Sequence, residues 1–293
     1  MNNVLHYAPQ TLAEALSLLA ENPQARVLAG GTDLIARWKK SDRADLTLVS
    51  LRRIDELARI EADEDGLFIG AAVTMDRLME PGPVRSTYPA LAQAAGQVGS
   101  VQIRNLATIG GNAVNAAPSA DTVPPLIIYR AEAVIASGQA ERRCPLEDFF
   151  TGPGRTVLQP GEILKGFRLP PQAAGSAAAF VKHSRRAGMD LATVGAALGL
   201  SVAADGFSLS SLRLVLGAVG PTPILVRGLS VVGRSLKSAA ALSELIGEQA
   251  VLEARPITDV RGSRDYRLAM VRETARACFE TAIEGLAQPA RGV

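Results

Sequence analysis

Cysteine, histidine and aromatic side chains are scarce in this sequence of 293 residues. Its two cysteines, Cys144 and Cys278, are too few for a disulfide framework and form no C-x-x-C pair of the kind that holds zinc or an iron–sulfur cluster. Its two histidines, His6 and His183, are likewise too few for a histidine-based metal site. We therefore expect two reduced thiols and no metal centre on this chain.

An excess of charge of one sign and a membrane-spanning run are also missing. The sequence has 31 Lys and Arg residues against 29 Asp and Glu residues, a formal net charge of +2, which argues against nucleic acid or an acidic membrane surface as a partner. The N-terminal residues lack the basic and apolar regions of a signal peptide. The longest apolar run, residues 191–204, is too short to span a bilayer and predicts a buried strand. These features predict a cytoplasmic protein.

The length of the chain suggests two domains, and its first part predicts a compact unit. Thr11 and Glu14 match a capping box at the start of the first helix. A strand (25–29) then ends at a glycine pair and leads into a helix (34–38) and a second strand (46–49). This order is typical of a βαβ-like unit.

The rest of the chain alternates short elements with turns. Residues 104–115 are rich in Gly, Asn and Thr and are predicted to form turns. The best domain boundary lies at residues 170–175, where two prolines precede small residues, and the strands and helix beyond it predict an α+β C-terminal domain. The predicted strands are residues 68–73, 133–136, 177–182, 191–200 and 212–219, and the predicted helices are residues 75–79, 88–98 and 264–286.

Two glycine pairs carry the chemistry that the sequence points to. The first lies in segment 28–34 (LAGGTDL) and the second in segment 108–112 (TIGGN), with Asp121 nine residues further on. A diphosphate needs backbone N–H groups aimed at it and no Cβ in the way, and paired glycines meet both needs because they reach positive φ at little cost. A helix follows the first pair at once and adds the positive end of its dipole.

The polar residues around these glycines suit the same ligand. Thr32 can donate its hydroxyl to a phosphate oxygen, whereas Asp33 is expected to cap the following helix. Thr108 and Asn112 are small donors beside the second pair, and Asp121 can accept hydrogen bonds from ribose hydroxyls. The alternative for either pair is a simple turn, because neither matches the G-x-G-x-x-G or the Walker A pattern. The residues by themselves thus predict a phosphate-bearing ligand and leave its identity open.

The second glycine segment belongs to a longer pattern that resembles a known family. Residues 104–112 (RNLATIGGN), 117–121 (APSAD) and 124–126 (PPL) resemble the signature of the FAD-binding medium subunits of molybdenum hydroxylases, the family of carbon monoxide dehydrogenase and xanthine dehydrogenase. Residues 29–34 (AGGTDL) resemble that family's other diphosphate loop. The resemblance extends over nearly the whole chain, with further matches at residues 161–164, 169–171, 182–186, 190–194, 217–223 and 259–263.

This resemblance implies an α+β fold, in which a two-lobed FAD-binding domain of the vanillyl-alcohol-oxidase type precedes a C-terminal α+β flavoprotein domain. The implied domains are residues 1–174, with lobes of about 1–55 and 56–174, and residues 175–293. The two glycine segments would hold the diphosphate of FAD, and Asp121 would meet its ribose end. The implied cofactor-binding residues are Leu28, Ala29, Gly30, Gly31, Thr32, Asp33, Leu34, Thr108, Ile109, Gly110, Gly111, Asn112, Asn115 (beside the diphosphate), Asp121, and Leu164 and Lys182 (near the adenine or the isoalloxazine edge).

Two absences refine the family interpretation. FAD is expected to be bound non-covalently, because the glycine segments contain no His or Cys. Residues 112–135 contain no cysteine, so the extra iron–sulfur cluster of the benzoyl-CoA-type reductases is not expected. No catalytic acid, base or nucleophile is assigned to this chain, because the redox chemistry belongs to the cofactor.

By resemblance, the chain is the FAD-binding electron-transfer subunit of a molybdenum hydroxylase, an oxidoreductase. Its expected partners are a large subunit with the molybdenum cofactor and a small subunit with [2Fe–2S] clusters, arranged as a dimer of heterotrimers, and the final electron acceptor is oxygen, NAD or a quinone. An alternative is a free-standing FAD-dependent oxidoreductase with its own substrate, which the scarcity of His and Tyr argues against. A non-enzymatic nucleotide-binding or scaffold protein is a third hypothesis, against which the intact glycines, Asn112 and Asp121 speak.

Overall fold

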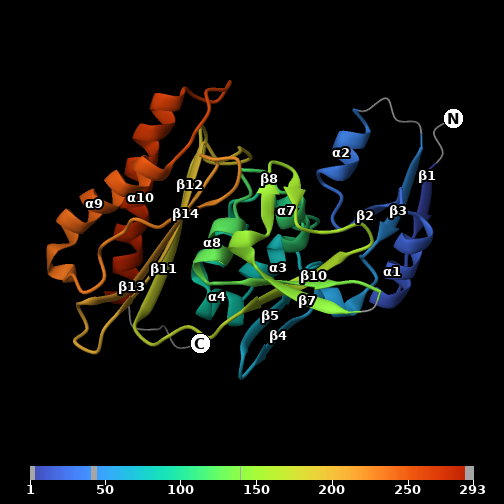
Figure 1. Ribbon diagram of the computed structural model, residues 1–293, viewed down its shortest axis with the longest axis horizontal. Helices are drawn as coiled ribbons and strands as arrows, with labels where there is room; N and C mark the ends of the chain where they lie inside the picture. The colour runs from blue at the N-terminus through green and yellow to red at the C-terminus, as the bar shows by residue number, and fades with distance from the viewer. Residues whose placement is uncertain (1–3, 41–44, 139, 288–293) are drawn as a thin grey trace.

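The computed structural model describes residues 4–40, 45–138 and 140–287. Figure 1 shows three parts in a row along the longest axis: a small N-terminal lobe, a central part, and a C-terminal part with two long helices on a sheet. Each part combines strands with helices, as the predicted α+β fold requires.

The N-terminal lobe is a small parallel sheet with two helices. Its elements are β1 (Val4–Tyr7), α1 (Leu12–Glu21), β2 (Arg26–Leu28), α2 (Leu34–Trp38) and β3 (Leu46–Ser50). The strand order is β1-β3-β2, and both outer strands run parallel to β3. Parallel strands need a long crossover connection, usually with a helix, and α2 lies in the connection between the parallel strands β2 and β3. The predicted βαβ-like unit is therefore confirmed.

The central part is an antiparallel sheet with helices packed on one face. Leu67, Ile69 and Phe167 point into the core that the helices share, whereas Phe68 and Arg168 lie on the opposite face and line a groove rich in charged side chains. The strand order is β4-β5-β10-β6-β7. The elements are η1 (Asp55–Ala58), β4 (Ile60–Asp63), β5 (Gly66–Gly70), α3 (Met75–Met79), α4 (Pro83–Thr87), α5 (Pro89–Gly96), α6 (Val101–Arg104), α7 (Ile109–Val114), α8 (Val123–Ile128), β6 (Glu132–Ala136), β7 (Glu141–Pro145), η2 (Leu146–Asp148), β8 (Phe150–Gly152), β9 (Arg155–Thr156) and β10 (Ile163–Leu169).

The C-terminal part is a four-stranded antiparallel sheet covered on both faces. Ala196 and Leu198 pack beneath the two long helices, whereas Phe180, Ala197 and Val215 belong to the core of the central part. Because β12 is buried on both faces, its sequence is an almost unbroken apolar run, and the predicted buried strand is confirmed. The elements are β11 (Ser176–His183), β12 (Val194–Val202), β13 (Leu209–Gly217), β14 (Ile224–Val226), η3 (Leu236–Ser238), α9 (Ala239–Glu253) and α10 (Arg264–Ala287).

The prediction of turns at residues 104–115 was wrong for the second half of this segment, which forms α7, while α6 ends at Arg104, where the segment begins. Each helix is started by a hydroxyl side chain that accepts a hydrogen bond from the backbone three residues further on. Ser100 Oγ accepts from the Ile103 N–H at 3.3 Å, and Thr108 Oγ1 accepts from the Gly111 N–H at 3.0 Å. Such N-caps stabilise short helices even where glycine lowers the helix propensity.

Other differences from the prediction are shifts of element ends. β5 ends at Gly70 instead of residue 73, because the chain turns there and the Val73 N–H donates to the Gly70 carbonyl at 3.1 Å. β12 begins at Val194 instead of residue 191. Within the described ranges, every helix is too short or too polar to cross a lipid bilayer.

Candidate functional site

The two glycine segments, far apart in the sequence, lie against each other in the fold. A Cβ at Gly30 would lie only 2.0 Å from the Leu106 carbonyl oxygen, so the first segment touches the backbone that leads into the second. A Cβ at Gly111 would lie 4.0 Å from the Cβ of Ala29. Only glycine permits this approach at position 30, because any side chain would collide with backbone atoms that cannot move aside.

The first segment presents a run of unpaired backbone donors. Among the described residues, the N–H groups of residues 30–34 donate to no protein acceptor, while the Gly31 and Asp33 carbonyls accept bonds from α2. Gly31 has a φ of +74°, a conformation that directs successive N–H groups to one side of the chain. The segment thus offers an anion the cradle of N–H groups that the sequence predicted.

The predicted capping role of Asp33 was wrong. Asp33 occupies the N-cap position of α2, but its side chain makes no capping hydrogen bond. Its backbone is already helical, with φ of −95° and ψ of −47°, and a capping side chain needs an extended backbone to reach the N–H groups of the first turn. Its exposed carboxylate therefore leaves the N–H groups of the first turn available.

The second segment differs from the first because its backbone donors are already bonded within the protein. Neither Gly110 nor Gly111 takes a positive φ, and all the N–H groups at the start of α7 have protein acceptors. A Cβ at Gly110 would lie 2.5 Å from the Ala71 Cβ, so this glycine lets α7 approach the end of β5. The acceptors are Val73 O for the Ile109 N–H, Ala71 O for Gly110, Thr108 Oγ1 for Gly111 and Thr108 O for Asn112.

What the second segment can offer a ligand is its amide side chains. Asn112 Oδ1 accepts a hydrogen bond from Thr122 Oγ1 at 2.7 Å, which orients the Asn112 amide so that its N–H groups point away. Asn115 Oδ1 accepts from Arg37 Nη2 at 2.7 Å, and this bond joins α2 to the end of α7. The Asn115 bond therefore places the Arg37 cation and the Asn115 amide together at the end of α2, and Gly111, the neighbour of Asn112, faces Ala29 of the first segment.

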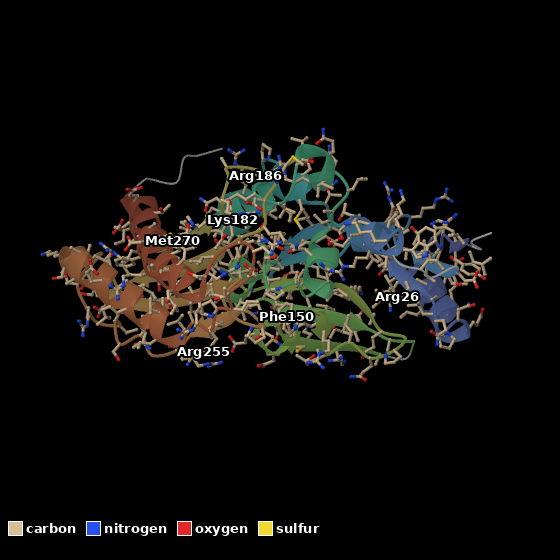
Figure 2. All side chains as sticks on the ribbon, turned by 90° about the horizontal axis from the view of Figure 1, so that it is seen from above. Arg26, Phe150, Lys182, Arg186, Arg255 and Met270 are labelled. Atoms are coloured by element: carbon tan, nitrogen blue, oxygen red, sulfur yellow. The ribbon has the colours of Figure 1, made fainter. Side chains whose placement is uncertain are left out.

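Asp121 and Lys182 form a buried ion pair at the junction of the central and C-terminal parts. Lys182 Nζ lies 2.7 Å from Asp121 Oδ2 and also donates to the Gln97 carbonyl at 3.0 Å. Only 5% of the Lys182 side chain and 8% of the Asp121 side chain are exposed. Figure 2 shows Lys182 between the C-terminal elements and the central helices. The structure thus brings two residues that were expected at different parts of the ligand into direct contact.

The Asp121 carboxylate has spare capacity for a hydrogen bond. Its Oδ1 atom is buried and has no partner among the described residues. Burial raises the pKa of Asp121 to about 6, although the nearby Lys182 ammonium works against this rise. The group is therefore mostly ionised at neutral pH, and its free oxygen suits a hydroxyl donor such as that of a ribose or ribityl chain.

Two of the predicted residues are core residues. Ile109 is fully buried, and Leu164 on β10 is buried in the same hydrophobic core, where its backbone pairs with Ile135 of β6. The hydrogen bonds and the ion pair of Asp121 and Lys182 involve neither Ile109 nor Leu164. A direct role for Leu164 therefore stays a prediction.

Sequence reasoning missed Arg37, Gln97 and Thr122. Arg37 follows the first segment by one helical turn, so its position after a phosphate loop was an available signal. Thr122 directly follows Asp121, and a hydroxyl beside a ligand residue was also visible. Gln97 contributes only its backbone carbonyl, which any residue type could supply, so no sequence signal existed.

These features fit a ligand with a diphosphate and sugar hydroxyls. The unpaired N–H groups of residues 30–34 suit the diphosphate, and the unpaired Asp121 Oδ1 atom suits a hydroxyl. Among the described residues, no group of three or more His, Cys, Asp and Glu side chains could hold a metal ion.

Two family models match the chain in succession. The model described as the FAD binding domain in molybdopterin dehydrogenase matches residues 2–172. The model described as the CO dehydrogenase flavoprotein C-terminal domain matches residues 179–282.

Individual relatives match almost end to end. The putative xanthine dehydrogenase FAD-binding subunit of Escherichia coli (strain K12) is 36% identical over 282 residues, which are 95% of either chain. The carbon monoxide dehydrogenase medium chain of Hydrogenophaga pseudoflava is 30% identical over 282 residues, 94% of this chain and 96% of that one. Among solved structures, carbon monoxide dehydrogenase from Hydrogenophaga pseudoflava superposes with a TM-score of 0.90 at 28% identity, over 96% of this chain and 98% of that chain. Quinoline 2-oxidoreductase from Pseudomonas putida 86 gives a TM-score of 0.88 at 30% identity, over 97% and 98%.

Proposed function

Because the chain belongs to the family of FAD-binding medium subunits of molybdenum hydroxylases, we propose that it transfers electrons from [2Fe–2S] clusters of a partner subunit to an external acceptor. The resemblance inferred from residues 104–126 is confirmed, and so is the fold of an FAD-binding domain followed by a C-terminal flavoprotein domain. FAD is the cofactor of the chain, which is a subunit of an oxidoreductase.

The observation that carries the placement of FAD is the run of unpaired N–H groups at residues 30–34. We place the FAD diphosphate there, with Thr32 and the amide groups of Asn112 and Asn115 as side-chain donors and Arg37 as a neutralising cation. Residues 108–112 then support the site by packing, and their backbone N–H groups do not bind the ligand. Asp121 accepts a hydrogen bond from a sugar hydroxyl, and Lys182 holds the carboxylate in place.

The redox chemistry is supplied by FAD, which can exchange single electrons with one partner and electron pairs with another. The residues of this chain bind the cofactor, orient it and exclude water. His183 and Tyr266 form a hydrogen bond of 2.8 Å beside this site, but His183 follows Lys182 on β11 and therefore points to the opposite face of the sheet. No proton transfer is assigned to either residue, in keeping with an electron-transfer role.

The relatives bear names of subunits, which supports a multi-subunit enzyme. We propose a large subunit with the molybdenum cofactor and a small subunit with [2Fe–2S] clusters as partners, in a dimer of heterotrimers in the cytoplasm. Oxygen, NAD or a quinone would take the electrons. We place the boundary between the FAD-binding and C-terminal domains at residues 174 and 175, in the connection between β10 and β11.

The test is a visible absorption spectrum of the full chain, purified alone and after co-expression with its genomic neighbours. We expect a flavin spectrum with one FAD released by acid per chain, and iron–sulfur absorbance only in the complex. A colourless complex without FAD would contradict the proposal.

The same preparations address the alternative of a free-standing oxidoreductase. If the chain holds FAD but co-purifies with no iron–sulfur or molybdenum subunit, and is reduced by an organic substrate on its own, that alternative replaces the electron-transfer role. A flavin that is reduced only when the iron–sulfur subunit is present supports the proposal.

A further inference from the structure

Arg267, in the first turn of α10, is the one arginine that is buried among the described residues, with 3% of its surface exposed. Its Nη1 atom donates to the Thr193 carbonyl at 2.7 Å and to the Ala218 carbonyl at 3.2 Å. Its Nη2 atom donates to Asp259 Oδ1 at 2.8 Å. One guanidinium therefore holds the start of β12, the end of β13 and the turn before α10 together.

The Thr193 contact leads towards Lys182. The Thr193 N–H donates to the His183 carbonyl at 2.8 Å, as the last rung of the pairing between β11 and β12. His183 directly follows Lys182, whose ammonium forms the ion pair with Asp121. Arg267 thus fixes the strand end from which Lys182 projects.

The Ala218 contact leads towards Asp121. The Ala218 N–H donates to the Pro118 carbonyl at 2.7 Å, across the boundary between the C-terminal and central parts. Pro118 lies three residues before Asp121, in a turn closed by the bond from the Ala120 N–H to the Ala117 carbonyl at 3.0 Å. Ala218 has a φ of +65°, which is unfavourable for a residue with a Cβ and persists only where its surroundings hold it.

We propose that Arg267 is a positioning residue of the FAD site. It sets the distance between Asp121 and Lys182 by donating to one carbonyl in each of the two segments that lead to this pair, the Thr193 carbonyl towards Lys182 and the Ala218 carbonyl towards Asp121. These two connections are the two routes to the ion pair. This inference rests on the proposed FAD site. The rigid fork of an arginine suits the task, because it can donate to two carbonyls and a carboxylate in fixed directions, whereas a lysine offers a single flexible ammonium. Asp259 holds the guanidinium in turn, and through it α10 is tied to the site.

The test is a double-mutant cycle on FAD affinity in the full chain, made with Arg267→Met, Lys182→Met and the double variant. Each single variant should weaken FAD binding about tenfold or more, and the double variant should bind no more than about twofold more weakly than Lys182→Met alone. Such coupling follows if Arg267 acts through the ion pair. If the two effects instead add, Arg267 has no positioning role and the proposal is overturned.

A matched control separates positioning from stability. Val271 is fully buried one turn further along α10, and its apolar side chain donates no hydrogen bond to either route. Val271→Ala should therefore lower the melting temperature, keep FAD affinity within about twofold, and have an effect that adds to that of Lys182→Met. If Arg267→Met binds FAD as well as Val271→Ala, the proposal fails.

A milder variant covers the case in which Arg267→Met does not fold. Asp259→Asn keeps an acceptor for the Arg261 N–H but removes the charge that holds Arg267, and its side chain is 26% exposed. It should show the same coupling with Lys182→Met, and additive effects would again overturn the proposal. A wild-type chain that retains no FAD would instead contradict the proposed function itself.

Discussion

At the scale of single residues, Asp121 has a carboxylate of which only one oxygen is used. Its Oδ2 atom binds Lys182, while its buried Oδ1 atom has no partner among the described residues. A buried acceptor without a hydrogen bond costs about 1–3 kcal/mol, and a ligand hydroxyl would remove this cost. Binding of a hydroxyl at this atom should therefore contribute favourably to the free energy of FAD binding.

This use of Asp121 predicts a pH dependence of FAD binding. With a pKa of about 6 in the free chain, the carboxylate is ionised at pH 7 and is protonated as the pH falls through 6. A hydroxyl donor favours the ionised form, so FAD affinity should fall about tenfold between pH 7 and pH 5, or about 1.4 kcal/mol. Fluorescence titration of the flavin-free chain measures this change, and Asp121→Asn should bind FAD more weakly with no such step. A wild-type affinity that does not change over this range would contradict the assignment of Asp121.

The contribution of Asp121 to the free energy of unfolding should change with pH in the opposite direction to its contribution to FAD affinity. This difference separates loss of FAD from unfolding of the chain. The pKa of Asp121 is raised in the folded chain above its unfolded value, so between about pH 4 and 6 the folded state binds more protons than the unfolded state. The contribution of Asp121 to the free energy of unfolding is therefore present at the acidic end of this range and is lost as the pH rises through about 6. FAD release at pH 5 would then occur from a folded chain.

Arg37 is the second residue whose position predicts a binding effect. Its bond to Asn115 places a cation beside the proposed diphosphate site. Arg37→Met should weaken FAD binding about threefold to tenfold, with a smaller loss at high salt because the attraction is screened. Lys39→Met is the control, since Lys39 is also exposed on the end of α2 but does not face the same side as Arg37. Equal effects of the two variants in a binding titration would show that only the overall charge matters.

At the scale of elements, two glycine pairs of similar sequence differ in how their backbone N–H groups are bonded. The N–H groups around the first pair have no acceptor within the described part of the chain, whereas the pair in α7 lets a helix pack against the end of β5. The difference arises because Thr108 caps α7 and turns its N–H groups inward, while Asp33 makes no capping bond in α2. Cofactor binding is therefore expected to depend on the first segment, and folding on the second.

This division predicts that Gly110→Ala destabilises the chain even without FAD. The new Cβ would lie 2.5 Å from the Ala71 Cβ and 2.7 Å from its carbonyl oxygen, so α7 must move away from β5. Overpacking of this kind costs about 1–3 kcal/mol, to be measured by urea unfolding of the flavin-free chain. Gly138→Ala is the matched control, because Gly138 has open space around it and no positive φ, and its change should stay within about 0.5 kcal/mol. Equal stability of the two variants would refute the packing role of Gly110.

At the scale of the whole molecule, the two parts joined by residues 170–175 share one hydrophobic core. Phe180, Ala197 and Val215 of the C-terminal sheet pack with the central helices. Arg213 adds an ion pair to Glu147 at 2.7 Å across the same boundary. The Asp121–Lys182 pair also spans it, so the binding site is complete only when both parts are in place.

We therefore predict that the full chain unfolds in one cooperative transition, because neither part can bury its apolar face alone. Calorimetry of the flavin-free chain should show a single peak. A fragment of residues 1–174 would expose α5 and α8 and lack Lys182, and it should aggregate and bind FAD weakly. Two separated transitions, or a soluble fragment with full FAD affinity, would contradict this prediction.

The sequence by itself determined the local elements and the family. The helix α1, with its stripe of apolar residues, and the doubly buried strand β12 were predictable because their patterns lie in consecutive residues. The βαβ-like unit and the motifs around both glycine pairs were equally visible. The start of α7 could also have been found from Thr108, whose capping role depends only on residues three positions apart.

Only the tertiary structure decided which groups are available to a ligand. The N–H groups of Ile109 and Gly110 donate to the Val73 and Ala71 carbonyls, just after β5. The ion pair between Asp121 and Lys182 joins residues that are 61 positions apart. Hydrogen-bond partners of this kind are set by how the sheet and helices pack, and no local pattern encodes them. Each residue carries its own hydrogen-bond donors and acceptors. Only the folded chain determines whether these groups bond within the protein or remain available to a cofactor.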